Sequence, residues 1–544
     1  MKSVGVGVLM ACLVGTTTVY VGLKTPFTME GSIPSAVFAF VLMAVLNRAF
    51  SLHENNLSQT LASAAGSTGS ITAFIPALLL LGYDFGAGEM VMWMASVAFL
   101  GVFFAVPLRN HLVVDEKLPF PAGTACAITL KNLHSRTREA IWEGRLLLAG
   151  AGASGVVTWF RDGIPKLIPD SMPLRIPLGR FNLAHLGFGI VWYPVLLGAG
   201  ALVGPKVGTG ILVGLGVWVI TALAMWNDPF TAWPQLYDWL LWPGVALLIA
   251  SGVTTLLLHW RALVRGILSI ASLSADGSGI SLRIWLSGLA LTSTLCVTTM
   301  VLLFGVPVWV AVLSVPVSFI LTAVSVRVYG ETGVHAVGPF SHAAQFLFGG
   351  LFSQSAATIV LSSGVTGAAS QESGDMLNDL KTGHLVNARP GQQFVAQLIG
   401  VAVGVAIAVP IFQLLVSAYG LASEQLPMPA AQIWVKSTTL LAGLAGPVEG
   451  DFLVRILVGG GVGVVLALLQ KTGISRFLPS TYGIGFALIL PPSYSLTLAL
   501  GALLAWALGW RSEVVRKYTP ATASGLIAGE AVVGVATAAI QVAL

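Results

Sequence analysis

Long apolar segments, separated by short polar ones, follow one another along almost the entire chain. A helix needs about 20 mostly apolar residues to cross the hydrocarbon layer of a membrane, and most of these segments reach that length. Three further apolar stretches, 118–130, 338–366 and 431–443, are shorter or interrupted and predict broken or re-entrant helices. The pattern therefore predicts an all-α polytopic membrane protein with about 14–16 transmembrane helices. The predicted spanning segments are 3–23, 31–50, 57–82, 88–108, 143–163, 183–203, 206–226, 236–258, 280–304, 306–326, 393–418, 449–470, 476–490, 494–510 and 521–543.

The composition agrees with this class. Of the 544 residues, 56% are hydrophobic and 9% are charged, whereas soluble domains carry about 25% charged residues. No connection is long enough to hold a soluble domain. The net charge of +5 comes from loops, so we interpret it as the bias of cytoplasmic loops toward Lys and Arg and not as binding to nucleic acid. This bias predicts a multi-pass protein of the plasma (inner) membrane with its N-terminus in the cytoplasm.

The glycines are concentrated where apolar segments are interrupted. Two clusters, 64–70 and 362–370, predict that the segments 57–82 and 338–374 are discontinuous helices. The alternative is close helix packing, because small residues let two backbones approach each other. Broken helices in corresponding halves of a chain are typical of the binding site of a transporter. The predicted transmembrane halves are residues 1–270 and 271–544.

A first group of polar residues lies at the start of the segment 57–82. Asn55, Asn56 and Gln59 carry carboxamides, and Asn55 and Gln59 share one helical face because they are four residues apart. Carboxamides offer both donors and acceptors, which suits a zwitterionic or peptide-like ligand. The alternative is hydrogen bonding between helices that fixes their packing. Glu54, next to this group, is a candidate for proton coupling.

A second group concentrates charge in a chain that has little of it. Glu372, Asp375 and Asp379 fall at i, i+3 and i+7, so a helix would present them as one acidic stripe, with Lys381 close behind. The stripe predicts a polar vestibule or substrate site that attracts the cationic groups of a ligand, while Lys381 would hold a carboxylate. The alternative is a solvated cytoplasmic loop. The other candidate binding residues are Gln345, Gln371, His384, Gln393 and Gln397.

Glu530 lies near the middle of the last apolar segment, with no charged residue within ten positions. A carboxylate at this depth costs about 2.5–3.5 kcal/mol on insertion scales, so it must face a cavity, find a partner or stay protonated. Glu530 is therefore the main candidate for proton coupling. The alternative is a protonated side chain with a purely structural hydrogen bond.

The same segments carry a family resemblance. "DLKTGHLVNARPGQQFVAQLIG" (379–400) resembles the hallmark of the oligopeptide transporter (OPT) family, particularly its yellow-stripe-like branch, and further segments follow in the expected order: "ENN" with Gln59, "LPFPAGTA" (118–125), "YGIGFALILPP" (482–492) and "ASGLIAGE" (523–530). The resemblance implies a proton-coupled secondary importer with two repeated halves. It implies short peptides, peptide-derived molecules or metal–chelate complexes as substrates.

Two other classes of function stay open at this point. A polytopic membrane enzyme acting on a peptide-like or lipid substrate would need a set of catalytic side chains that the fold brings together. An uncoupled channel would let its substrate cross without coupling to a proton gradient. No HExxH, GxSxG or GxxxxGK[ST] pattern is present. We expect no cofactor, with the proton gradient as driving force and metal bound only within a chelate substrate. The expected partners are a small peptide or chelate and the lipid bilayer, and a homodimer remains one candidate for the oligomeric state.

Overall fold

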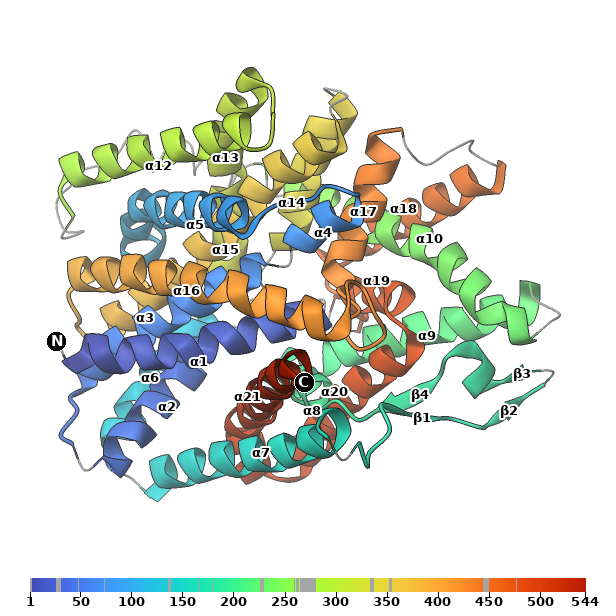
Figure 1. The fold of residues 1–544 in the computed structure, drawn as a ribbon, viewed down its shortest axis with the longest axis horizontal. Coiled ribbons are helices and arrows are strands. Elements are labelled where there is room, and N and C mark those ends of the chain that lie inside the picture. Colours follow the sequence, from blue (N-terminus) through green and yellow to red (C-terminus); the bar gives the residue numbers. More distant parts are fainter. Residues whose placement is uncertain are drawn as a thin grey trace.

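The computed structural model (Figure 1) confirms an all-α polytopic membrane protein. In the part of the chain that it describes, eleven helices are long and apolar enough to cross a membrane, and shorter apolar helices accompany them. Helices α1, α5, α7, α12 and α16 run in roughly the same direction in this view, and the strands lie at its right edge next to α9. The structure describes the whole chain except residues 1, 26–30, 47, 73, 136–137, 165, 180, 226–228, 259, 261–263, 265–279, 333–336, 352–354, 444–449 and 476.

The first helices surround the segment that carries the Asn/Gln group. Helix α3 begins at a capping box, in which the Ser51 hydroxyl accepts from the Glu54 backbone N–H and the Glu54 carboxylate accepts from the Ser51 N–H. This cap accounts for the position of Glu54, whose predicted role in proton coupling stays a prediction. The elements of this part are α1 Lys2–Lys24, α2 Ser32–Val45, α3 Leu52–Ile71, α4 Ile75–Leu80, α5 Ala87–Arg109, the π-helix η1 Asn110–Asp115, α6 Pro121–His134 and α7 Arg138–Asp162.

A narrow β-ribbon follows α7, where the predicted spanning segment 183–203 should begin. That prediction is wrong: only α8, Pro194–Val203, is helical, because strands and a 3-10 turn occupy the preceding residues and Pro194 starts the helix. Strand β1 pairs with β4, and β2 pairs with β3, both antiparallel. The ribbon consists of β1 Ser171–Pro173, β2 Pro177–Leu178, β3 Phe181–Asn182, the 3-10 helix η2 Leu183–Leu186 and β4 Gly189–Val191.

Proline begins many of the later helices, because its fixed φ suits the first helical turn and its missing N–H is not needed there. The boundary predicted between the two halves, at residues 270 and 271, lies outside the described residues. The remaining elements are α9 Pro205–Met225, α10 Pro229–Leu258, α12 Leu282–Leu302, α13 Val308–Thr332, α14 Val337–Gln345, the π-helix η3 Phe346–Leu351, α15 Ala356–Leu385, α16 Pro390–Tyr419, α17 Pro429–Leu441, α18 Gly450–Leu469, α19 Thr481–Ile489, α20 Pro492–Arg511 and α21 Glu513–Ala543.

The segments 57–82 and 338–374 are discontinuous, but not at their glycine clusters. Helix α3 ends at Ile71 and helix α15 begins at Ala356, so both clusters lie inside continuous helices. The glycines serve close packing instead, which was the alternative interpretation. A Cβ at Gly69 would lie 2.9 Å from the carbonyl oxygen of Gly15, and one at Gly364 would lie 2.9 Å from the ring of Trp93.

The same close packing joins α16 to α3, which lie side by side with α1 in Figure 1. A Cβ at Gly400 would overlap the carbonyl oxygen of Leu61. We expect Gly400→Ala to lower the free energy of unfolding by about 1–3 kcal/mol, because the backbone of α3 has to move away. The measurement is the apparent melting temperature of the purified protein in detergent.

Gly216 in α9 provides the matched control, since nothing lies within 4 Å of the Cβ that alanine would add there. Gly216→Ala should leave the melting temperature unchanged or raise it slightly, because alanine favours a helix over glycine by up to about 1 kcal/mol. Equal losses in both variants would contradict a specific contact at Gly400.

Candidate functional site

Helix α15 is buried along nearly its entire length although it carries the acidic stripe. Every residue from Ala356 to Gly383 is buried, including Glu372, Asp375, Asp379 and Lys381. The helix packs against α3, α5, α13 and α14. The alternative of a solvated loop is therefore wrong for residues 367–383, and a short turn before Pro390 connects α15 to α16.

Each carboxylate of the stripe accepts a hydrogen bond from a side chain of α3. The order of the partners shows that α3 and α15 run antiparallel. The three pairs are Thr68 Oγ1 to Glu372 Oε1 (2.7 Å), Ser63 Oγ to Asp375 Oδ1 (2.6 Å) and Gln59 Nε2 to Asp379 Oδ1 (2.5 Å). We call these three carboxylates and their partners on α3 and α16 the acidic seam.

Helix α16 closes the seam with two amides one turn apart. Gln397 Nε2 donates to Asp375 Oδ2 at 3.2 Å, and Gln393 Nε2 donates to the backbone oxygen of Asp379 at 2.7 Å. Ser32, at the start of α2, donates to Asp379 Oδ1 at 3.0 Å. The predicted residues Gln59, Glu372, Asp375, Asp379, Gln393 and Gln397 thus lie together at one place.

Several buried oxygens of the seam have no hydrogen-bond donor among the described residues. They are all acceptors: Gln59 Oε1, Glu372 Oε2, Gln393 Oε1 and Gln397 Oε1. Leaving a buried polar atom unsatisfied costs about 1–3 kcal/mol. A group that brings N–H donors or positive charge would satisfy these acceptors, so the arrangement suits the cationic part of a ligand.

The other predicted residues on α3 and α15 flank the seam. Asn55 Nδ2 lies 3.2 Å from His134 Nε2 of α6, and Asn56 is buried with neither polar atom hydrogen-bonded in the described part of the chain. Gln371 is also buried, whereas His384 is exposed at the C-terminal end of α15. Lys381 is buried one turn before that end.

Gln345 belongs to a different hydrogen-bond network. It lies on α14, where Ser437 Oγ donates to its Oε1 at 2.8 Å and its Nε2 donates to Thr438 Oγ1 at 3.0 Å. Both partners are on α17. The structure therefore gives Gln345 no hydrogen bond to the acidic seam.

The sequence analysis missed four polar residues of this region. Ser63 lies one turn after Gln59, so the helical face of Gln59 would have indicated it. Thr68 and Ser32 have no such local signal. Asn378 lies between the acidic residues and its Oδ1 accepts from the N–H of Gly123 at 2.6 Å, which fixes the start of α6 against α15.

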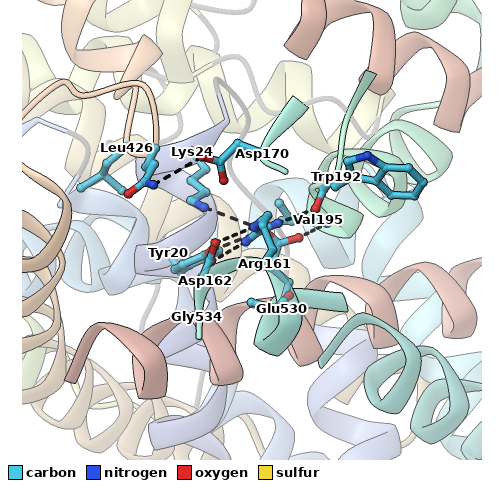
Figure 2. Close-up of polar contacts among 12 residues, drawn as sticks. Tyr20, Lys24, Arg161, Asp162, Asp170, Trp192, Val195, Leu426, Glu530 and Gly534 are labelled. Carbon is cyan, nitrogen blue, oxygen red and sulfur yellow. Dashed lines mark hydrogen bonds and ion pairs between the residues drawn. The ribbon is translucent and has the colours of Figure 1, made fainter. Parts of the chain in front are cut away.

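Glu530 of α21 has charged partners from distant segments (Figure 2). Arg161 Nη2 donates to Glu530 Oε1 at 3.1 Å, and the backbone N–H of Val195 donates to Oε2 at 2.7 Å. Lys24 Nζ lies 3.9 Å from Oε1, and the Tyr20 hydroxyl donates to the same oxygen at 3.3 Å. Glu530 therefore satisfies the requirement for a partner at membrane depth.

Arg161 is the centre of this group. Its Nε and Nη2 donate to the two carboxylate oxygens of Asp162 at 2.6 Å each, and its Nη1 donates to the backbone oxygen of Trp192 at 2.5 Å. The guanidinium also lies 3.9 Å from the ring centroid of Tyr193. We call Lys24, Arg161, Asp162 and Glu530 the ion-pair cluster. Arg161 is buried in the last turn of α7, so it does not mark a cytoplasmic loop.

The described residues hold no group of three or more His, Cys, Asp or Glu side chains arranged to bind a metal ion. The carboxylates of the seam follow one another along α15, and each is bonded to its own donor. The arrangement offers binding by hydrogen bonds and charge, distributed over several helical turns.

Comparison with known proteins covers almost the entire chain. The family described as OPT oligopeptide transporter protein matches residues 1–541. A Haemophilus influenzae protein named as an oligopeptide transporter is 29% identical over 96% of this chain and 92% of its own length. A Saccharomyces cerevisiae protein, also named as an oligopeptide transporter, is 24% identical over 97% of this chain and 94% of its own length. A protein of Oryza sativa subsp. japonica named as a metal-nicotianamine transporter is 24% identical over 82% of this chain and 72% of its own length. The chain belongs to the OPT oligopeptide transporter family.

Proposed function

We propose that this protein is a proton-coupled importer of small oligopeptides or peptide-like metal chelates that works by alternating access. The acidic seam is the observation that carries the proposal. Three buried carboxylates and several amide oxygens without donors converge from α3, α15 and α16. The names of its relatives, which include oligopeptide and metal-nicotianamine transporters, support the same class of substrate.

The seam would bind the cationic part of the substrate. Glu372 and Asp375 would accept from an ammonium group, because low-dielectric walls strengthen such contacts. Lys381, buried further along α15, would hold a carboxylate or balance the charge of Asp379. His384 is exposed and would line the exit from the seam.

The orientation of the chain follows from its basic loops. The bias of cytoplasmic loops toward Lys and Arg supports an N-terminus in the cytoplasm of a plasma (inner) membrane protein. Helix α3 then runs outward together with α1, because Gly7 faces Leu61 while Thr18 faces Gly69. In this orientation Asp379 lies toward the cytoplasm, and Lys24 lies toward the outside.

Glu530 is our proposed proton-coupling residue. A carboxylate held by Arg161 and by the nearby Lys24 can change its proton occupancy when either cation moves away during transport. No resident cofactor is proposed: the proton gradient would drive uptake, and metal would enter only within a chelate.

The test is uptake into proteoliposomes under an imposed pH gradient, with labelled trialanine and iron–nicotianamine as probes. We expect wild-type protein to accumulate at least one probe when the outer solution is acidic. Glu530→Gln should still fold, since glutamine keeps one acceptor oxygen, which can serve either Arg161 Nη2 or the Val195 N–H, but its uptake should no longer respond to the gradient. Gradient-driven uptake that is unchanged in Glu530→Gln would make Glu530 structural.

Two other results would replace the proposal. Hydrolysis of trialanine by the purified protein would favour a membrane enzyme. Equilibration of the probe without accumulation, at any pH gradient, would favour a channel.

A further inference from the structure

Lys24 is a buried cation for which the described residues offer no hydrogen-bond acceptor. Its side chain is 2% exposed, and its Nζ lies 3.9 Å from the nearest carboxylate oxygen, Glu530 Oε1. In the described part of the chain no acceptor lies within hydrogen-bonding distance of this ammonium. Arg161, beside it, is bonded to Asp162, Trp192 and Glu530. Of the two cations in the ion-pair cluster, Lys24 is therefore the one whose N–H donors are available for a ligand.

Aromatic rings surround this ammonium in place of acceptors. Its Nζ lies 4.0 Å from the ring centroid of Tyr193, 4.7 Å from that of Tyr20 and 5.8 Å from that of Tyr419. Ring faces stabilise a desolvated cation but leave its three N–H donors unused. A carboxylate is the ligand group that satisfies them best, because charge-assisted hydrogen bonds are about twice as strong as neutral ones.

Lys24 lies on the outer side of the acidic seam in the proposed orientation. Thr68, which donates to Glu372, precedes Gly69, and Gly69 packs against Thr18 of α1. At about 1.5 Å per residue, Lys24 is about 9 Å beyond Thr18 along the axis of α1. A substrate that enters from outside would therefore meet the level of Lys24 before that of the seam.

We propose that Lys24 binds the carboxylate of the transported substrate. This inference rests on the proposed function and adds a specificity-determining residue that sequence reasoning did not indicate. The carboxylate is the C-terminus of a short peptide or a carboxylate of a metal chelator, and in both cases it replaces the distant contact between Lys24 and Glu530.

The experiment compares uptake of trialanine and trialanine amide, which differ in the C-terminal carboxylate. Wild-type protein should take up the free acid about tenfold to a hundredfold faster than the amide, because the loss of one hydrogen bond to a charged group has an effect of about this size. Lys24→Gln should lose this preference, because its uptake of trialanine should fall further than its uptake of the amide. Lys24→Arg, which keeps the cation, should retain most of it.

Lys436→Gln is the matched control, because Lys436 also lies over an aromatic ring, 5.5 Å from the centroid of Trp242, but belongs to neither polar group. It should keep the wild-type preference. Melting temperatures of all variants separate loss of folding from loss of recognition. If Lys24→Gln folds and keeps the preference for the free acid, Lys24 does not bind the carboxylate.

The second probe, iron–nicotianamine, tests the case in which the carboxylate belongs to a metal chelator. If wild-type protein takes up only iron–nicotianamine, Lys24→Gln should raise the KM for that chelate about tenfold. An unchanged KM would overturn the inference and leave the proposed function standing. Failure of wild-type protein to take up either probe would instead overturn the proposed function, and this inference with it.

Discussion

Arg161→Met is expected to lower the free energy of unfolding by about 3–5 kcal/mol, the cost of removing one partner from a buried ion pair. The variant leaves Asp162 and Glu530 buried with only the distant ammonium of Lys24 between them. It also removes the donor to the backbone oxygen of Trp192 and so weakens the anchoring of the β-ribbon. The measurement is the apparent melting temperature in detergent, with the fraction of monodisperse protein as a second readout.

Arg455→Met is the matched control. Arg455 is half-buried, and its hydrogen bond runs to the backbone oxygen of Asp451 in its own helix, with no carboxylate partner among the described residues. Its removal should change stability by less than about 0.5 kcal/mol, as is usual for surface substitutions. A melting temperature for Arg161→Met equal to that of Arg455→Met would mean that the ion-pair cluster contributes no stability.

Asp379→Asn is expected to reduce substrate uptake about tenfold to a hundredfold while leaving the melting temperature unchanged. Asparagine keeps an oxygen for the donors of Gln59 and Ser32, so the packing of α2, α3 and α15 survives. What disappears is the negative charge that would attract a cationic group of the substrate. Initial rates of uptake into proteoliposomes, normalised to the amount of reconstituted protein, measure the effect.

Asp451→Asn serves as the control, because Asp451 is an exposed carboxylate at the start of α18. It should transport at the wild-type rate. Lys381→Ala tests the other end of the seam and should also reduce uptake at an unchanged melting temperature. If both seam variants transport normally, the acidic seam fixes helix packing and the substrate passes elsewhere.

The sequence predicted the helical fold because the length of each apolar segment can be read from consecutive residues, without knowledge of the rest of the structure. It also predicted that Glu372, Asp375 and Asp379 share one face, since their i, i+3, i+7 spacing defines a face wherever the helix lies. It left two environments open for that face, a polar site and a solvated loop, and the burial of α15 excludes the loop. A polar stretch of this length is typical of a loop, and only the donors on α3 and α16 allow it to be buried.

The ion-pair cluster could not be predicted, because its members come from α1, α7 and α21. Arg161 and Glu530 are separated by 369 residues, and no pattern in either segment indicates the other. One signal did point toward the cluster, namely the lone carboxylate of Glu530 in an apolar segment.

The burial of α15 has a consequence for how the chain is made. This helix is not among the candidate membrane spans of the described residues, and each acidic side chain near the membrane centre costs about 2.5–3.5 kcal/mol on insertion scales. Helices α3, α5, α6, α13 and α14, all of which pack against α15, are synthesised before it. The hydroxyl and amide donors of α3 are thus already in the bilayer when the carboxylates leave the ribosome, and the amides of α16 follow 14 and 22 residues after the residues that they contact. Synthesis in this order lets the acidic helix α15 enter the membrane with its α3 donors already in place.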